Sequence, residues 1–176
     1  MRRPVPRARH IVETPYVAAD VETTGLSPAG GHRVCEIALL RFLRGTVIDS
    51  LVSLVNPLRP IDPGASAVNG ITDAMVARAP TFSDLFPGIL EFLGDDPLVF
   101  HNAPFDLSFL RAEARLAGGA WPGNPVLDTL PLARRTGRFR SHSLSHLCRE
   151  LGIGNGFHRA EADAYAAGKL LLHLTA

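Results

Sequence analysis

The chain has 176 residues, of which 46% are hydrophobic and 20% are charged, and its formal net charge at pH 7 is +1. This length and composition predict one compact domain with a sizeable core, and they exclude a disordered or fibrous protein. A nearly neutral chain has no overall basic field that attracts nucleic acid, so any such binding must depend on local patches or on bound cations.

The two cysteines and the N-terminal segment indicate the compartment. Cys35 and Cys148 have neither metal-ligand spacing nor the pattern of a disulfide framework. Cys148 shares a helical stripe with three leucines, which favours a buried thiol. No apolar run is long enough to span a bilayer, and residues 1–13 are predicted to be a flexible basic arm without a signal peptide's apolar stretch. We therefore expect a cytoplasmic protein with no membrane partner, folded as a single domain over residues 14–176.

The first half of the chain predicts an antiparallel meander. Strands are expected at about 16–22, 33–43 and 46–55, with a Thr-Thr-Gly turn after the first. Arg44-Gly45 forms the tight turn between the second and the third. The prolines and glycine that follow predict a loop, since they are too dense for an element interior; these are Pro57, Pro60, Pro63 and Gly64.

The second half predicts strand–helix units. Thr72 and Ser83 are expected to be N-caps of two short helices, and Asp128 the N-cap of a later one. Two further strands are expected at about 98–101 and 126–127, and three further helices at about 104–117, 143–151 and 159–174. Three early strands followed by such units imply an α/β domain with a mixed five-stranded sheet and helices on its faces.

Asp20 and Glu22 are two residues apart on the first predicted strand, so their side chains project from the same face. Such a pair at a strand end is often only solvated surface. Here Val17, Ala18 and Ala19 indicate a central strand, and two carboxylates on a buried strand are costly unless a cation neutralises them.

Two later segments supply further acids and one histidine. Asp106 lies in the first turn of its predicted helix, at the edge of the buried face, where the helix dipole alone can also favour an acid. Asp163 shares an inward helical face with Ala167 and Leu170. His158, five residues earlier, is expected in the loop that enters this helix, where it can take a proton from a water molecule. Alone, each of these residues also has an ordinary structural interpretation.

Four carboxylates without matching bases repel one another unless cations neutralise them. Oxygen ligands suit Mg²⁺ or Mn²⁺, and these metals most often serve phosphoryl chemistry. The three motifs that carry these acids resemble those of the DEDD superfamily of 3′–5′ exonucleases, which has a ribonuclease H-like fold. The histidine five residues before the last aspartate resembles the DEDDh branch, whereas the sister branch has a tyrosine at the position of Arg159.

The resemblance covers residues 14–174 and is greatest to the proofreading epsilon subunits of bacterial replicative polymerases and their stand-alone relatives. It implies a ribonuclease H-like sheet of three antiparallel and then two parallel strands, flanked by helices. It also implies two divalent ions, Mg²⁺ or Mn²⁺, at one catalytic site. The implied metal ligands are Asp20, Glu22, Asp106 and Asp163, with His158 as the general base.

The same resemblance implies a substrate pocket and a reaction. Thr23 and Leu26 are expected to contact the terminal nucleotide, and Asn102 and Phe105 to line the opposite wall. The expected reaction releases nucleoside 5′-monophosphates from single-stranded or frayed DNA 3′ ends, in proofreading or repair, with a DNA polymerase as a candidate partner. RNA 3′-end trimming and a non-catalytic, polymerase-associated module are the alternatives, and the oligomeric state stays open.

Several basic residues have no assigned role. A group of arginines either follows the phosphates of the bound strand or forms a solvated face; these are Arg134, Arg135, Arg138 and Arg140. His101 is expected to be structural. The remaining histidines other than His158 show no catalytic pattern; these are His10, His32, His142, His146 and His173.

Overall fold

The computed structural model describes residues 13–154 and 158–175, so the predicted N-terminal arm lies outside the described residues apart from Glu13. A five-stranded sheet has the order β3-β2-β1-β4-β5. The strands are β1 (Tyr16–Thr23), β2 (Val34–Leu43), β3 (Thr46–Leu54), β4 (Leu98–Phe100) and β5 (Val126–Asp128). β1, β2 and β3 pair antiparallel, while β4 runs parallel to β1 and β5. The predicted mixed sheet is therefore confirmed.

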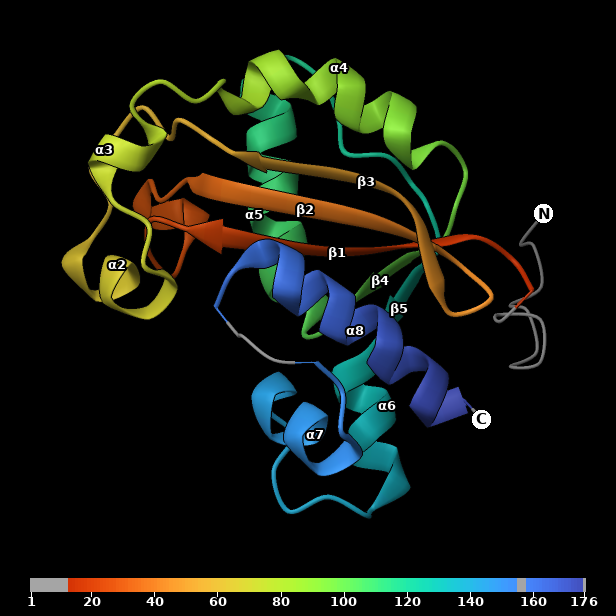
Figure 1. Ribbon diagram of the computed structural model, residues 1–176. Helices are drawn as coiled ribbons and strands as arrows, with labels where there is room; N and C mark the ends of the chain where they lie inside the picture. Colours follow the sequence, from red (N-terminus) through yellow and green to blue (C-terminus); the bar gives the residue numbers. More distant parts are fainter. Residues whose placement is uncertain (1–12, 155–157, 176) are drawn as a thin grey trace.

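Helices cover both faces of this sheet (Figure 1). They are α2 (Pro63–Asn69), α3 (Asp73–Val76), α4 (Phe82–Leu93), α5 (Ala103–Leu116), α6 (Thr129–Thr136), α7 (Leu144–Leu151) and α8 (Ala160–Thr175), with a short 3₁₀ helix, η1, at Pro28–Gly30. α4 and α5 pack on one face, and α8 packs on the other with α6 and α7 beside it. Among the described residues, no helix has the length and apolar character needed to cross a membrane.

The alternation of side chains along β1 divides the core into two layers. Val17, Ala19 and Val21 are buried against α4 and α5, whereas Tyr16 and Ala18 are buried against α8. Because side chains alternate along a strand, the even-numbered positions that follow also face the α8 side. The side chains of Asp20 and Glu22 therefore lie on the face of the sheet that α8 covers.

α8 lies very close to β2, and a glycine makes this possible. A Cβ atom at Gly168 would lie 2.5 Å from a ring carbon of Phe42. Tyr16 reaches the same point, since its hydroxyl donates a hydrogen bond of 3.1 Å to the Gly168 carbonyl.

Between β2 and β3, Arg44 and Gly45 both have positive φ, 51° and 75°, as the predicted tight hairpin turn requires.

Two predicted boundaries were wrong. Pro63 and Gly64 are not in a loop but begin α2, because a proline is tolerated at the first helical position, where no intrahelical partner exists for its N–H. Ser83 is not the N-cap of α4; Thr81 is, and it forms a capping box with Asp84. The Thr81 hydroxyl accepts from the Asp84 backbone, and the Thr81 backbone donates to the Asp84 side chain.

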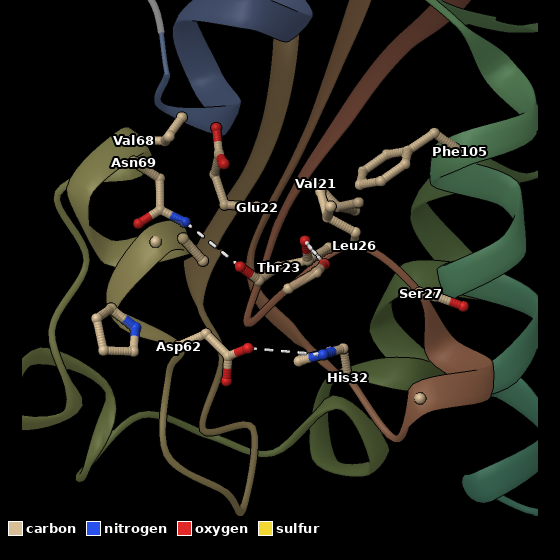
Figure 2. Close-up of a pocket in the computed structure, with 15 residues that line it drawn as sticks. Val21, Glu22, Thr23, Leu26, Ser27, His32, Asp62, Val68, Asn69 and Phe105 are labelled. Carbon is tan, nitrogen blue, oxygen red and sulfur yellow. Dashed lines mark hydrogen bonds and ion pairs between the residues drawn. The ribbon is translucent and has the colours of Figure 1, made fainter.

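The end of β1, η1, α2 and the start of α5 surround a pocket (Figure 2). The pocket lies at the carboxyl end of the central strand β1, where the turn after β1 comes close to α2 and α5. Of the two β1 acids, Glu22 lines this pocket.

Candidate active site

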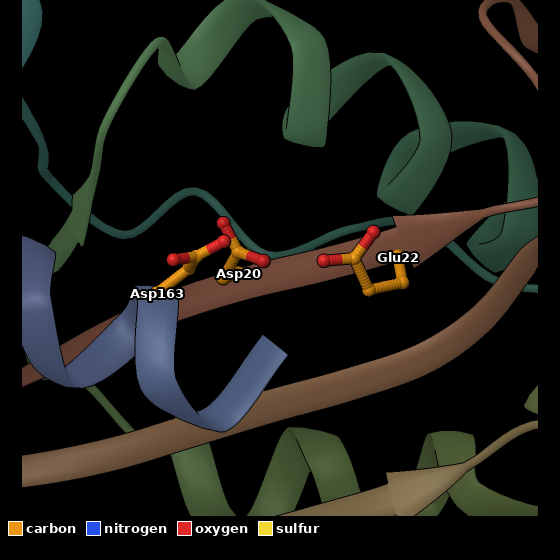
Figure 3. Close-up of side chains that lie close together, drawn as sticks. All are labelled: Asp20, Glu22 and Asp163. Atoms are coloured by element: carbon orange, nitrogen blue, oxygen red, sulfur yellow. The ribbon is translucent and has the colours of Figure 1, made fainter. Parts of the chain in front are cut away.

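The carboxylates of Asp20, Glu22 and Asp163 face one another over β1 (Figure 3). One carboxylate oxygen from each lies within 4.8 Å of the other two. Asp20 and Glu22 come from alternate positions of β1, and Asp163 comes from the first turn of α8. The structure thus brings together three of the four predicted metal ligands.

Asp106, the fourth, lies beside this cluster and is 3% exposed. Its Oδ1 accepts a hydrogen bond of 3.2 Å from the backbone N–H of Val21, between the two acids of β1. It stands in the first turn of α5, as the sequence predicts. One oxygen is therefore held by the strand, while its charge acts on the neighbouring acids.

Burial and mutual repulsion raise the pKa values of these carboxyls. Loss of water raises the pKa of Asp106 to about 8 and, together with Asp163 and Glu36, raises the pKa of Glu22 to about 7. The pKa of Asp20 is raised well above its usual range by burial, and then by Asp106 and Asp163. Burial also raises the pKa of Asp163. A bound cation would reduce the electrostatic repulsion within such a cluster.

An unsatisfied oxygen indicates where that charge fits. Oδ1 of Asp163 is buried and has no hydrogen-bond partner among residues 13–154 and 158–175. Its Oδ2 accepts a hydrogen bond of 3.1 Å from the backbone N–H of His158. Buried polar atoms without partners are rare in folded proteins. An orphaned carboxylate oxygen beside two further carboxylates fits a divalent cation with oxygen ligands.

His158 lies just ahead of α8, as predicted, and its φ of 68° is in the left-handed region. Non-glycine residues adopt this region uncommonly, and histidine is among those that do so most often. With Asp20 and Asp163, His158 lines a cavity of about 630 Å³. The structure therefore places the predicted base in the wall beside the acids. Residues 155–157, which precede it, are outside the described part of the chain.

Three of the four predicted substrate residues share the pocket of Figure 2, a cavity of about 710 Å³ on the Glu22 side of the acids. Thr23, Leu26 and Phe105 line it, and Leu26 is 86% exposed. Asn102 does not belong to this pocket but lines the cavity on the Asp20 side. Asn102 is the N-cap of α5 and has a φ of 73°. Because its backbone is not helical, its side chain does not share the helical face of Phe105.

The same pocket contains residues to which the sequence assigned no site role. A Cβ atom at Gly25 would lie 2.3 Å from the His32 ring, so only glycine fits beneath that ring. His32 Nε2 lies 3.7 Å from an Asp62 carboxylate oxygen, and its Nδ1 lies 3.2 Å from the Thr24 hydroxyl. His32 thus connects the turn after β1 to the start of α2, and no local pattern reveals this contact.

Asn69 lies in the wall of the same pocket and is buried. Its Nδ2 donates a hydrogen bond of 3.4 Å to the carbonyl of Thr23, and its Oδ1 accepts one of 2.9 Å from the backbone of Ile71. The asparagine therefore fixes the backbone of a predicted substrate residue.

Sequence reasoning also missed Glu36, which is 2% exposed and lies opposite Glu22 in the β1–β2 register. Its Oε2 accepts hydrogen bonds of 3.0 Å from Arg159 Nε and 2.9 Å from the backbone N–H of Ala160. A second ion-pair contact joins the Arg159 guanidinium to Glu36 Oε1. Glu36 therefore holds the start of α8, and with it Asp163, against the sheet.

In the absence of metal, we expect the protein to become less stable as pH rises. Unfolded Asp and Glu lose their protons near pH 4, whereas folded Glu22 and Asp106 keep theirs up to pKa values of about 7 and 8. Between these limits the folded state binds more protons, so the free energy of unfolding falls with rising pH. The measurement is the unfolding temperature in EDTA at several pH values between about 4 and 8.

Two controls identify the groups responsible. Glu22→Gln and Asp106→Asn should each flatten this dependence, because each removes one proton-binding group. Saturating Mg²⁺ should raise the unfolding temperature most at the alkaline end, since the metal binds the ionised cluster. A metal-free protein that gains stability steadily over this range would contradict the argument.

The comparisons with known proteins agree with this geometry. Residues 17–171 match the family model described as exonuclease. The chain is 39% identical to the PolC-type DNA polymerase III of Bacillus cereus over 168 residues, which are 94% of this chain and 12% of that protein. It is 41% identical over 175 residues to a DNA polymerase III subunit epsilon-like protein of Rhodobacter capsulatus, covering 93% of this chain and 25% of that one.

A solved structure extends the comparison to the fold. Exonuclease X in complex with 5′ overhanging duplex DNA superimposes with a TM-score of 0.71 at 30% identity, covering 89% of this chain and 88% of that chain. The resemblance predicted from the three motifs is thereby confirmed. Since the family model spans nearly the whole described fold and the likeness extends over about nine-tenths of the sequence, this chain belongs to the exonuclease family.

Proposed function

We propose that this domain is a 3′–5′ exonuclease that removes nucleoside 5′-monophosphates from DNA 3′ ends with the help of divalent cations. The observation that carries the proposal is the convergence of the Asp20, Glu22 and Asp163 carboxylates at the boundary between two cavities. DNA is favoured as substrate because both relatives are named as DNA polymerase III proteins and Exonuclease X is described with DNA. A DNA polymerase is the proposed partner for the same reason.

Asp20, Glu22, Asp106 and Asp163 would hold two Mg²⁺ or Mn²⁺ ions. When bound, such ions supply positive charge that offsets the carboxylates and the scissile phosphate and make water a better nucleophile. Thr23, which lines the pocket of Figure 2, would contact the terminal nucleotide, together with the two apolar residues proposed for this role, Leu26 and Phe105.

His158 would act as the general base, since it lines the cavity that also contains Asp20 and Asp163. A neutral imidazole nitrogen accepts a proton from water as the oxygen attacks phosphorus. The bond between phosphorus and the 3′ oxygen of the preceding nucleotide breaks, and this oxygen takes a proton from solvent water to become the hydroxyl of the new 3′ end. The phosphate stays on the released nucleotide as its 5′-monophosphate.

The test uses single-stranded DNA and RNA of one sequence, labelled at the 5′ end, with Mg²⁺, Mn²⁺ or EDTA. We expect DNA to shorten from its 3′ end one nucleotide at a time, faster than RNA, and we expect EDTA to stop the reaction reversibly. Faster loss of RNA would assign the domain to RNA 3′-end trimming, because the 2′-hydroxyl is what separates the two substrates. No cleavage with either metal would favour a non-catalytic module.

A further inference from the structure

The two cavities lie on either side of the acidic cluster. Glu22 lines the pocket of Figure 2, whereas Asp20 and Asp163 line the second cavity. If the terminal nucleotide enters the first and its phosphate reaches the acids, the remaining strand has to continue past them. The nucleotide before the scissile bond therefore meets the second cavity, where a wall from α6 and the start of α7 faces the acids.

Arg134 supplies a positive charge to that opposite wall. It is exposed in the last turn of α6 and lines the cavity with Asp20 and Asp163. None of the ion pairs found between described residues involves Arg134, although acids border the same cavity. A planar guanidinium without a carboxylate partner matches the geometry of a phosphate group.

His142 adds an unpartnered ring nitrogen to the same wall. Its Nε2 is buried and has no hydrogen-bond partner within the described ranges, and the residue lines the cavity. Its backbone carbonyl lies 2.9 Å from His101 Nε2, a bond that fixes this segment to the start of α5. A buried ring nitrogen without a partner costs free energy, and the oxygen of a bound phosphate would satisfy it.

From these contacts we infer that Arg134 and His142 form a subsite for the phosphate immediately 5′ to the scissile one. The inference rests on the proposed function and adds a contact to the strand that remains bound after cleavage. Such a contact reads no base, because the phosphate is common to all nucleotides. It should therefore act mainly on KM and equally on all DNA sequences.

The test compares Arg134→Ala with Arg135→Ala on single-stranded DNA. Both arginines lie in the last turn of α6 and are exposed, but only Arg134 lines the cavity. We expect Arg134→Ala to lower kcat/KM by about tenfold or more, chiefly through KM, since a charge-assisted hydrogen bond is lost. Arg135→Ala should stay near wild type, and Arg134→Lys should recover part of the loss because it keeps the charge but not the fork.

A chemically modified strand locates the contact. A methylphosphonate at the linkage 5′ to the scissile phosphate removes the charge of that phosphate alone. It should slow the wild-type enzyme, while Arg134→Ala on this strand should cost little more, because the two changes remove the same interaction. His142→Ala should show the same dependence on the modification.

Additive losses from the arginine variant and the modified strand would overturn the subsite, as would equal effects of Arg134→Ala and Arg135→Ala. A wild-type enzyme that cleaves neither strand would instead overturn the proposed function, and the subsite with it. Thermal unfolding of each variant checks that the fold is retained.

Discussion

Replacing Asp20 with asparagine is expected to abolish cleavage of DNA 3′ ends while making the metal-free protein more stable. Asp20 shares the tight group of carboxylates, and its raised pKa reflects burial and repulsion from Asp106 and Asp163. An amide has nearly the same shape but removes both the ligand charge and the repulsion. The loss of a metal ligand should lower turnover by at least about 10³-fold.

The stability gain has a pH dependence that identifies its origin. In EDTA the unfolding temperature of Asp20→Asn should exceed that of wild type at pH 8, and the difference should shrink as the pH falls, because protonation removes the charge of the wild-type carboxyl. Added Mg²⁺ should stabilise the variant less than wild type. Asp95→Asn is the matched control, because Asp95 is exposed and lies far from Asp20 in the sequence, in the loop after α4. Near-normal turnover of Asp20→Asn would remove Asp20 from the metal site.

Replacing His158 with alanine is expected to lower turnover by about 10²–10⁴-fold, the usual contribution of a positioned general base. The wild-type rate should rise with pH through the ionisation of this histidine, because only the neutral ring accepts a proton. The alanine variant should lose that part of the pH–rate profile. Its metal affinity should remain, since the carboxylate cluster does not include the histidine.

Metal affinity and catalysis are therefore separable at this position. His173→Ala is the control, since His173 is exposed in the last turn of α8, the helix that follows His158. Isothermal titration with Mn²⁺ measures affinity, and the pH dependence of turnover measures the base. An alanine variant that lost metal affinity but kept the wild-type pH profile would make His158 a ligand rather than the base.

The contact between Glu36 and Arg159 explains how the acids of two distant segments are held at fixed spacing. Glu36 accepts hydrogen bonds from Arg159 and from the backbone of Ala160, the two residues that directly follow His158. The same helix then places Asp163 over β1. A buried glutamate on β2 thus positions both the predicted base and one predicted ligand.

The sequence of strands along the chain and the shared face of Asp20 and Glu22 on β1 were predictable from local sequence. Asp20 and Glu22 share a face because alternation is a property of any strand, and Arg44-Gly45 makes its turn through its own backbone preferences. Asp128 caps α6 as predicted, with its side chain accepting from the Leu130 backbone. These features depend on residues close together in the chain, so their pattern is visible in the sequence.

Competing local signals made two boundaries unpredictable. Thr81 and Ser83 are both good N-caps, and the choice depended on the reciprocal bonds between Thr81 and Asp84. The proline density before α2 indicated a loop, yet Pro63 occupies the one helical position that suits it.

Only the tertiary structure decided where the other residues of the site lie relative to the carboxylate cluster. Glu36 and Arg159 form their ion pair across 123 residues of sequence. Arg134, on α6, lines the same cavity as Asp20 of β1. Asn102 lies in that cavity rather than with Phe105 because a cap with positive φ leaves the helical repeat. Contacts of this kind form only when packing brings separate elements together, and neither partner's own segment carries a periodicity that records them.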